Sequence, residues 1–195
     1  MPNLDLRPAT ERMARLLGEV DDGELANATP CPDYRLGDLI DHVGGFALAF
    51  TAAAAKELNG LTSWPRAAAA ANLEPGWRAR ITGDLAGLAA AWQAPDAWEG
   101  MTKAGGVDLP GALAGRVALD ELVVHGWDIA QATGQPFDCD DETLGEVEAT
   151  VRQIRRGNEG ELPGLFGPIV AVPETAPRLD TVLGLTGRDP RWSPA

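Results

Sequence analysis

Apolar residues recur at helical spacing through most of the first 156 residues, in segments separated by short breaks that contain proline or glycine. This pattern predicts helices over about residues 8–20, 35–59, 77–92, 111–133 and 141–156. The fourth has the clearest ends, because Pro110 precedes it, Gly134 stands where a left-handed cap closes a helix, and Pro136 prevents continuation. Residues 98–110 contain three glycines and predict an ordered loop or a small hairpin. We therefore expect an all-α protein.

The composition changes from Gly157 onward, where six prolines interrupt any long element. Within this region the sequence predicts one short helix, over residues 179–185. The few apolar residues of the region could not close a hydrophobic core of their own. We therefore expect residues 1–156 to form a helical domain, and residues 157–195 to form an irregular proline-rich tail packed on it rather than a second domain.

The chain has 195 residues, of which 29 are acidic and 16 are basic, and its formal net charge is −13. Proteins that bind nucleic acids or anionic membrane surfaces use clustered Lys and Arg, so this charge argues against both classes. The sequence has no run of about 18 apolar residues, and its first residues do not form an export signal. Small molecules or other proteins are the expected partners, the cytoplasm is the expected compartment, and a monomer and a homodimer are both compatible with the sequence.

Glu121 and His125 stand four residues apart in the fourth predicted helix, so they share a face. That face is otherwise apolar, while Arg116, Asp120 and Trp127 point elsewhere. The apolar members of the face are Ala114, Val117, Ala118 and Ile129. An ionised carboxylate in such a stripe costs several kcal/mol unless a partner compensates its charge. The pattern therefore calls for a cation or a hydrogen-bonding partner beside Glu121.

The chain has only two histidines, and the second, His42, lies on the flank of the apolar stripe of the second predicted helix. Two imidazoles and one carboxylate form a common three-ligand set for zinc, nickel or ferrous iron, which leaves positions open for water, a thiolate or a substrate oxygen. The sequence thus offers His42, Glu121 and His125 as metal ligands. On the pattern alone, a simple hydrogen bond between Glu121 and His125 is an equally good interpretation.

Asp128 also faces inward, since it lies about 20° from Glu121 around the helix. It could orient a ligand imidazole or contact bound water, which makes it the one candidate catalytic residue, and it could equally cap a neighbouring helix. Cys31 and Cys139 are too far apart for a metal or redox motif. No basic residue adjoins either cysteine in the sequence, so neither is predicted to be a nucleophile.

Three stretches of the chain resemble the motifs of a known family. These are Thr29-Pro30-Cys31-Pro32-Asp33-Tyr34, Leu36-x-Asp38-Leu39-Ile40-x-His42-Val43-x-Gly45, and Glu121-Leu122-x-x-His125-x-Trp127-Asp128-Ile129-Ala130-x-Ala132-x-Gly134. They resemble the actinobacterial metal-binding proteins of the DinB-like superfamily that are related to the N-terminal domain of mycothiol-dependent maleylpyruvate isomerase. The resemblance runs from the first helix to about Gly134, and residues 183–190 resemble the tail of the shorter, single-domain branch.

The resemblance implies a DinB-like four-helix bundle, here with an extra helix and the proline-rich tail. It also implies a divalent metal held by the positions that match His42, Glu121 and His125, with zinc as the first expectation and nickel or iron as alternatives. In the isomerase, the open metal position receives the thiolate of mycothiol. Related proteins transfer low-molecular-weight thiols to electrophiles, or isomerise or degrade small acids.

The chain departs from the isomerase after Gly134, because residues 135–195 do not match the separate C-terminal domain that contributes to substrate binding there. Maleylpyruvate isomerisation itself is therefore not expected. The sequence favours a metal- and thiol-dependent transferase or isomerase that acts on a small electrophilic molecule. Two other functions fit the same residues, namely a non-catalytic metal- or ligand-binding bundle, and a metal-dependent hydrolase that uses activated water with Asp128 as its free carboxylate.

Overall fold

The computed structural model describes residues 3–57, 60–63, 67–162 and 164–194. Over these residues the protein is mostly helical, with seven α-helices and one two-stranded sheet. The α-helices are α1 (Arg7–Gly18), α2 (Leu36–Ala54), α3 (Gly60–Ser63), α4 (Trp77–Ala91), α5 (Gly111–Thr133), α6 (Asp141–Arg155) and α7 (Arg178–Leu185). The strands are β1 (Met101–Ala104) and β2 (Val107–Pro110), and short 3-10 helices cover Asp22–Glu24, Ala70–Asn72 and Pro95–Trp98.

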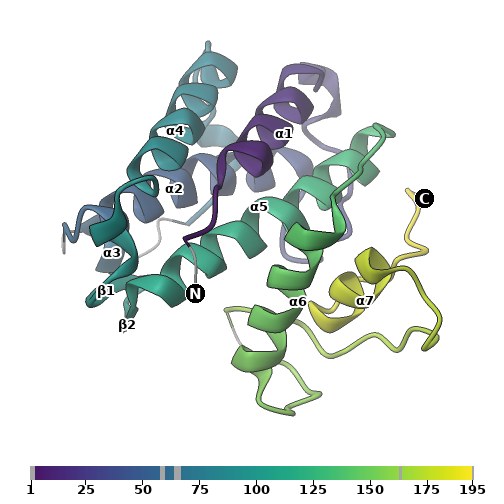
Figure 1. Ribbon diagram of the computed structural model, residues 1–195. Helices are drawn as coiled ribbons and strands as arrows, with labels where there is room; N and C mark the ends of the chain where they lie inside the picture. The colour runs from purple at the N-terminus through teal and green to yellow at the C-terminus, as the bar shows by residue number, and fades with distance from the viewer. Residues whose placement is uncertain (1–2, 58–59, 64–66, 163, 195) are drawn as a thin grey trace.

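Four of the long helices make the main core. Both α1 and α2 pack against α4 and against α5, as Figure 1 shows. Large apolar side chains from all four helices are almost fully buried between them: Met13, Leu17, Leu39, Ile40, Ile81, Leu85, Leu88, Leu122 and Ile129. The direct packing of α2 on α5 determines where the candidate ligands lie, because His42 belongs to α2 and Glu121 and His125 belong to α5.

The second predicted helix ends five residues earlier than the sequence indicates. α2 ends at Ala54, and Lys56 adopts the left-handed conformation with φ of +58°. The side chain of Lys56 donates a hydrogen bond of 2.8 Å to the carbonyl of Ala97, which belongs to a distant part of the chain. The backbone N–H groups of Lys56 and Glu57 donate to the carbonyls of Ala53 and Ala52, so a Schellman motif with Lys56 in the left-handed position closes the helix. The rest of the prediction, at residues 58 and 59, lies outside the described residues.

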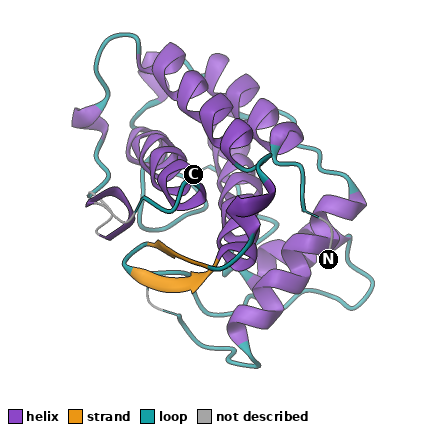
Figure 2. Cartoon of the chain, turned by 60° about the vertical axis from the view of Figure 1, so that its left-hand side comes forward, coloured by secondary structure: helices purple, strands orange, loops and turns teal. Residues whose placement is uncertain are grey.

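Residues 101–110 form the hairpin that was one of two alternatives for this segment (Figure 2). β1 and β2 pair antiparallel through a two-residue turn in which Gly105 and Gly106 have φ of +57° and +81°, the conformation that glycine adopts most easily. The hydroxyl of Thr102 donates to the carbonyl of Ala53 at 2.6 Å and so ties the hairpin to the end of α2. The hairpin is the one sheet among the described residues of an otherwise helical protein.

α5 is buried on nearly all sides. One side faces α1 and α2, while α6 packs on another side and α7 packs on α6 (Figure 1). Arg116, Asp120 and Trp127, which point away from the Glu121 face, are therefore also buried. Val182, Leu183 and Leu185 of α7 are buried as well. Residues 157–195, which we call the C-terminal segment, therefore contribute apolar surface to this packing. None of the described helices combines the length and apolar character needed to cross a membrane.

Replacing Gly115 of α5 with alanine is expected to lower the free energy of unfolding by about 1–3 kcal/mol, the usual cost of overpacking. A Cβ at this position would lie 2.6 Å from the ring of Trp98 and 2.8 Å from that of Trp92. Gly87→Ala in α4 is the matched control, since no described atom lies within 4 Å of its added Cβ. It should raise stability by about 0.5–1 kcal/mol. Urea unfolding measures the free energy of unfolding of both variants. Equal changes in the two variants would contradict the close packing of Gly115 against Trp92 and Trp98.

Candidate metal centre

Three side chains from α2 and α5 converge on one point. Nε2 of His42 lies 3.2 Å from Oε2 of Glu121, and Nε2 of His125 lies 3.2 Å from the same oxygen. All three donor atoms lie within 4.8 Å of one another. The i, i+4 spacing on α5 brings Glu121 and His125 together, and the packing of α2 on α5 adds His42. The structure thus brings together the three residues that the sequence offers as metal ligands.

Asp128 lies behind His125 rather than beside the other donors. Its Oδ2 is 2.9 Å from Nδ1 of His125, and its side chain is completely buried. A carboxylate accepts hydrogen bonds, so Nδ1 carries the proton of the imidazole. In a neutral ring, Nε2 then has a bare lone pair that faces Oε2 of Glu121, and two acceptors would oppose each other. Either a proton on Nε2 or a cation between the two atoms must separate them.

The electrostatics of the metal-free chain follow from this arrangement. Burial would raise the pKa of Glu121, but hydrogen bonds to His125 and His42 outweigh burial and hold that pKa well below its usual range. Burial would lower the pKa of His125, but its hydrogen bonds to Asp128 and Glu121 raise it to about 9. In the absence of a metal, a proton therefore occupies the place between His125 and Glu121 that a cation would take.

The donor set fits a small divalent cation. Two imidazole nitrogens and one carboxylate oxygen are usual zinc ligands, and the donors of a tetrahedral site with bonds of about 2.0–2.2 Å lie about 3.3–3.6 Å apart. The side chains of His42 and Glu121 keep 25% and 23% of their surface exposed, while His125 keeps 10%. Solvent and small ligands can therefore approach from the side of His42 and Glu121.

Aromatic rings hold His42 in place. The ring of Tyr34 stacks on it with centroids 5.1 Å apart, and the ring of Phe46 meets it edge-on at 5.6 Å. The imidazole of His125 also meets it edge-on, at 5.0 Å. Neither aromatic contact was predicted from the sequence, although Tyr34 belongs to a motif and Phe46 follows His42 by one helical turn. These contacts fix the direction in which Nε2 of His42 points.

A second group of metal-binding side chains overlaps the first. Donor atoms of Cys31, His125 and Asp128 also lie within 4.8 Å of one another. The guanidinium of Arg188, however, already contacts both oxygens of Asp128, with Nη2 at 3.1 Å from Oδ2 and Nε at 3.4 Å from Oδ1. A positive charge is therefore present beside this second group, which makes it a poor place for another cation. The same contacts leave Asp128 ill placed to take a proton from water.

The tertiary structure brings a basic residue near each cysteine, although none adjoins either cysteine in the sequence. Arg188 interacts electrostatically with Cys31, and Arg12 does so with Cys139. Burial outweighs these charges and raises the pKa of each thiol to about 11. Arg188 itself was missed because 60 residues separate it from Asp128 in the sequence. The one sequence signal that could have pointed to Arg188 is its place in residues 183–190, which resemble the C-terminal tail of the single-domain proteins of the family.

The raised thiol pKa values predict slow alkylation. A higher pKa means a smaller thiolate fraction at any given pH, so the rate with iodoacetamide should still rise about tenfold per unit from pH 8 to pH 10. Thiols of the urea-unfolded chain, with an ordinary pKa of about 8.5, should level off near pH 9. Peptide mapping after timed alkylation follows Cys31 and Cys139 separately. A folded-state rate that levels off near pH 9 would contradict the burial.

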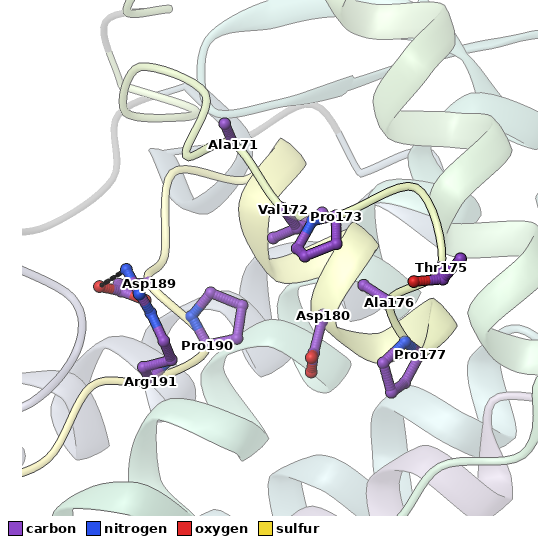
Figure 3. A pocket seen from close by; sticks show the side chains of 10 residues that line it. All are labelled: Ala171, Val172, Pro173, Thr175, Ala176, Pro177, Asp180, Asp189, Pro190 and Arg191. Atoms are coloured by element: carbon purple, nitrogen blue, oxygen red, sulfur yellow. Dashed lines mark hydrogen bonds and ion pairs between the residues drawn. The ribbon is translucent and has the colours of Figure 1, made fainter.

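A surface hollow of about 370 Å³ lies within the C-terminal segment (Figure 3). It is lined by residues 171–173, 175–177, 180 and 189–191. Two of its charged residues, Asp189 and Arg191, pair with each other at 3.3 Å. None of the three converging donors lines it, so it is not part of the candidate metal centre.

Comparison with protein families gives one match over most of the chain. The family described as the mycothiol maleylpyruvate isomerase N-terminal domain matches residues 6–130. This span contains His42, Glu121, His125 and Asp128, and it excludes α6, α7 and Arg188. Two uncharacterized proteins, from two strains of Mycobacterium tuberculosis, are each 28% identical to the chain over 190 residues, which is 94% of this chain and 95% of theirs.

Two solved structures share the fold. The crystal structure of the mycothiol-dependent maleylpyruvate isomerase is 24% identical, with a TM-score of 0.59, and the match covers 74% of this chain and 65% of that one. The structure of a mutant of that enzyme is 22% identical, with a TM-score of 0.62 and coverage of 80% and 70%. The chain thus spans slightly less than two thirds of the length of the first structure.

Proposed function

Because the chain belongs to the family of the mycothiol maleylpyruvate isomerase N-terminal domain, we propose that it is a divalent-metal- and thiol-dependent enzyme acting on a small electrophilic molecule. His42, Glu121 and His125 hold the metal, for which zinc is the first choice, and Asp128 positions His125. The thiol is a low-molecular-weight one of the mycothiol type, and the reaction is a transfer or an isomerisation.

One observation carries this proposal. Nε2 of His42 and Nε2 of His125 each lie 3.2 Å from Oε2 of Glu121, a separation that suits two donors of one tetrahedral cation, and the contact of Nδ1 with Asp128 leaves Nε2 as the nitrogen of His125 that faces Glu121. The partial exposure of His42 and Glu121 also leaves room for a ligand that the protein does not supply.

The charges of the three residues suit a thiolate. Glu121 contributes one negative charge and two neutral imidazoles contribute none, so a divalent ion at this place would keep a net charge of +1. Such an ion supplies the positive charge that stabilises a thiolate at neutral pH. The rings of Tyr34 and Phe46 keep His42 in the orientation that this requires, and Asp128 does the same for His125.

The isomerase matches this chain over only part of its length, so its substrate cannot be transferred directly to this protein. The match covers 65% of that enzyme's chain, so the substrate proposed for this chain is a chemical class, small electrophiles, rather than maleylpyruvate. A hydrolase has less support, because both oxygens of Asp128 are engaged by Arg188 and one of them by His125. A non-catalytic metal- or ligand-binding protein is the alternative that experiment must separate from the enzyme.

The test uses cobalt-loaded wild-type protein and a small thiol, with mycothiol as the first choice. Thiol addition is expected to produce a sulfur-to-cobalt charge-transfer absorption, because the site has a free position. The zinc-loaded protein should then consume members of a panel of small electrophiles faster than thiol alone does. Glu121→Gln should abolish both signals, whereas Glu142→Gln, an exposed acidic residue of α6, should abolish neither.

The outcomes separate the candidate functions. Metal binding without thiol binding or turnover would favour the non-catalytic alternative. Turnover of an ester or amide without thiol would favour the hydrolase. Absence of metal binding in the wild-type protein would remove the basis of both enzyme functions and leave only a metal-independent ligand-binding role.

A further inference from the structure

The C-terminal segment reaches the candidate metal centre through one side chain. Arg188 follows α7, and its backbone N–H donates to the carbonyl of Leu183 at 2.9 Å. The residue before it, Gly187, has φ of +85°, and a Cβ there would lie 2.8 Å from Gly167. Only glycine fits this turn, and the turn directs Arg188 toward α5. Arg188 lies outside residues 6–130, the part of the chain that the family covers.

The guanidinium of Arg188 is itself buried, with 8% of the side chain exposed. It donates to both oxygens of Asp128 and, through Nη1, to the carbonyl of Thr186 at 2.8 Å. Asp120 is close enough to interact with it electrostatically. Asp128 is fully buried and cannot turn to water for compensation. Arg188 supplies a positive charge beside this buried carboxylate, whose other partner is the imidazole of His125.

The chain of contacts continues into the metal centre. Oδ2 of Asp128 accepts from Arg188 at 3.1 Å and from Nδ1 of His125 at 2.9 Å. The planar fork of an arginine fixes the plane of the carboxylate that it binds. The carboxylate in turn fixes the tautomer and the ring orientation of His125, which sets the direction of the Nε2 lone pair. Arg188 thus contacts none of the converging donors and acts on one of them through Asp128.

We infer that Arg188 is a positioning residue of the metal centre, which makes metal affinity depend on the turn that follows α7. The inference rests on the proposed function, because it presumes that a metal binds at His42, Glu121 and His125. It adds a residue that lies outside the matched part of the chain, and it gives the C-terminal segment a role beyond covering α5.

The test is a double-mutant cycle read as zinc affinity, measured on the full chain by competition with a chromophoric chelator. Arg188→Gln is expected to weaken zinc binding by up to about 10-fold, less than the roughly 10- to 100-fold that loss of Asp128, the direct outer partner of His125, usually costs. In an Asp128→Asn background the same substitution should change affinity by no more than about twofold, because the route through Asp128 is already cut.

A matched control separates this role from a structural one. Arg178→Gln removes another arginine of the same segment, which donates to the carbonyl of Asp141 at 2.8 Å and lies beside Glu148, away from the metal centre. It should leave zinc affinity and the visible spectrum of the cobalt-loaded protein unchanged. Arg188→Lys, which keeps the charge but not the fork, should fold and give an intermediate loss.

Each result decides one claim. A wild-type protein that binds no zinc would overturn the proposed function. A wild-type protein that binds zinc, together with an Arg188→Gln variant of equal affinity, would overturn the positioning role alone. So would a loss that is equally large in the wild-type and Asp128→Asn backgrounds. If Arg188→Gln does not fold, the Arg188→Lys variant decides, and unchanged affinity and cobalt spectrum would contradict the inference.

Discussion

A His125→Ala variant is expected to lose nearly all of the zinc that the wild-type protein binds. His125 supplies one of three protein donors, and even an outer partner of such a ligand is worth about 10- to 100-fold in affinity, so loss of the ligand itself should cost well over about 100-fold. After zinc loading and dialysis, metal analysis should find about one equivalent in the wild-type protein and little in the variant.

The controls for this result come from the same chain. His42→Ala should behave like His125→Ala, because the two imidazoles lie at equal distances from Oε2 of Glu121. Glu142→Gln should keep its zinc, since this exposed residue of α6 is not one of the converging donors. Equal metal content in the wild-type protein and both histidine variants would mean that zinc binds elsewhere.

Removal of the metal is expected to lower the melting temperature by about 5–10 °C. A ligand that binds only the folded state at 100 times its dissociation constant stabilises that state by about 2.7 kcal/mol, and about 2–4 °C corresponds to each kcal/mol in a chain of this size. Thermal unfolding of the zinc-loaded protein, with and without an excess of chelator, measures the difference. The donors come from α2 and α5, so the metal links two helices of the core.

The Glu121→Gln variant separates this effect from other actions of the chelator. Its amide keeps the shape of the side chain but not the charge, so zinc should add little to its melting temperature. An identical shift in the wild-type protein and in Glu121→Gln would show that the stabilising metal is not held by this carboxylate.

The parts of the fold that the sequence predicted well are those with local causes. α5 begins and ends at the predicted residues because Pro110 and Gly134 fix its ends, and Gly134 has the expected left-handed conformation, with φ of +67°. The predicted end of α2 was wrong because Lys56 takes the left-handed position of a Schellman motif, where glycine is the usual sequence signal and this chain has none at that position. The hairpin was one of two predicted alternatives, because two adjacent glycines are compatible with a turn in an ordered loop and with a turn in a hairpin.

In the candidate metal centre, too, the contacts between residues close in the sequence were predictable and the long-range contact was not. The spacing of Glu121 and His125 on one helix is local information, and the scarcity of histidine singled out His42 as their companion. The orienting contact from Asp128 to His125 is likewise only three residues long. Arg188 reaches Asp128 across 60 residues, through a turn that depends on the close approach of Gly187 and Gly167. Its role therefore became visible only with the tertiary structure.

The central claim is that His42, Glu121 and His125 hold a metal ion. Anomalous diffraction at the zinc edge, on crystals of the zinc-loaded full chain, tests it most directly. The account predicts one strong anomalous peak between Nε2 of His42, Nε2 of His125 and the carboxylate of Glu121. A peak beside Cys31 and Asp128 instead, or well-ordered crystals with no peak near these donors, would contradict it.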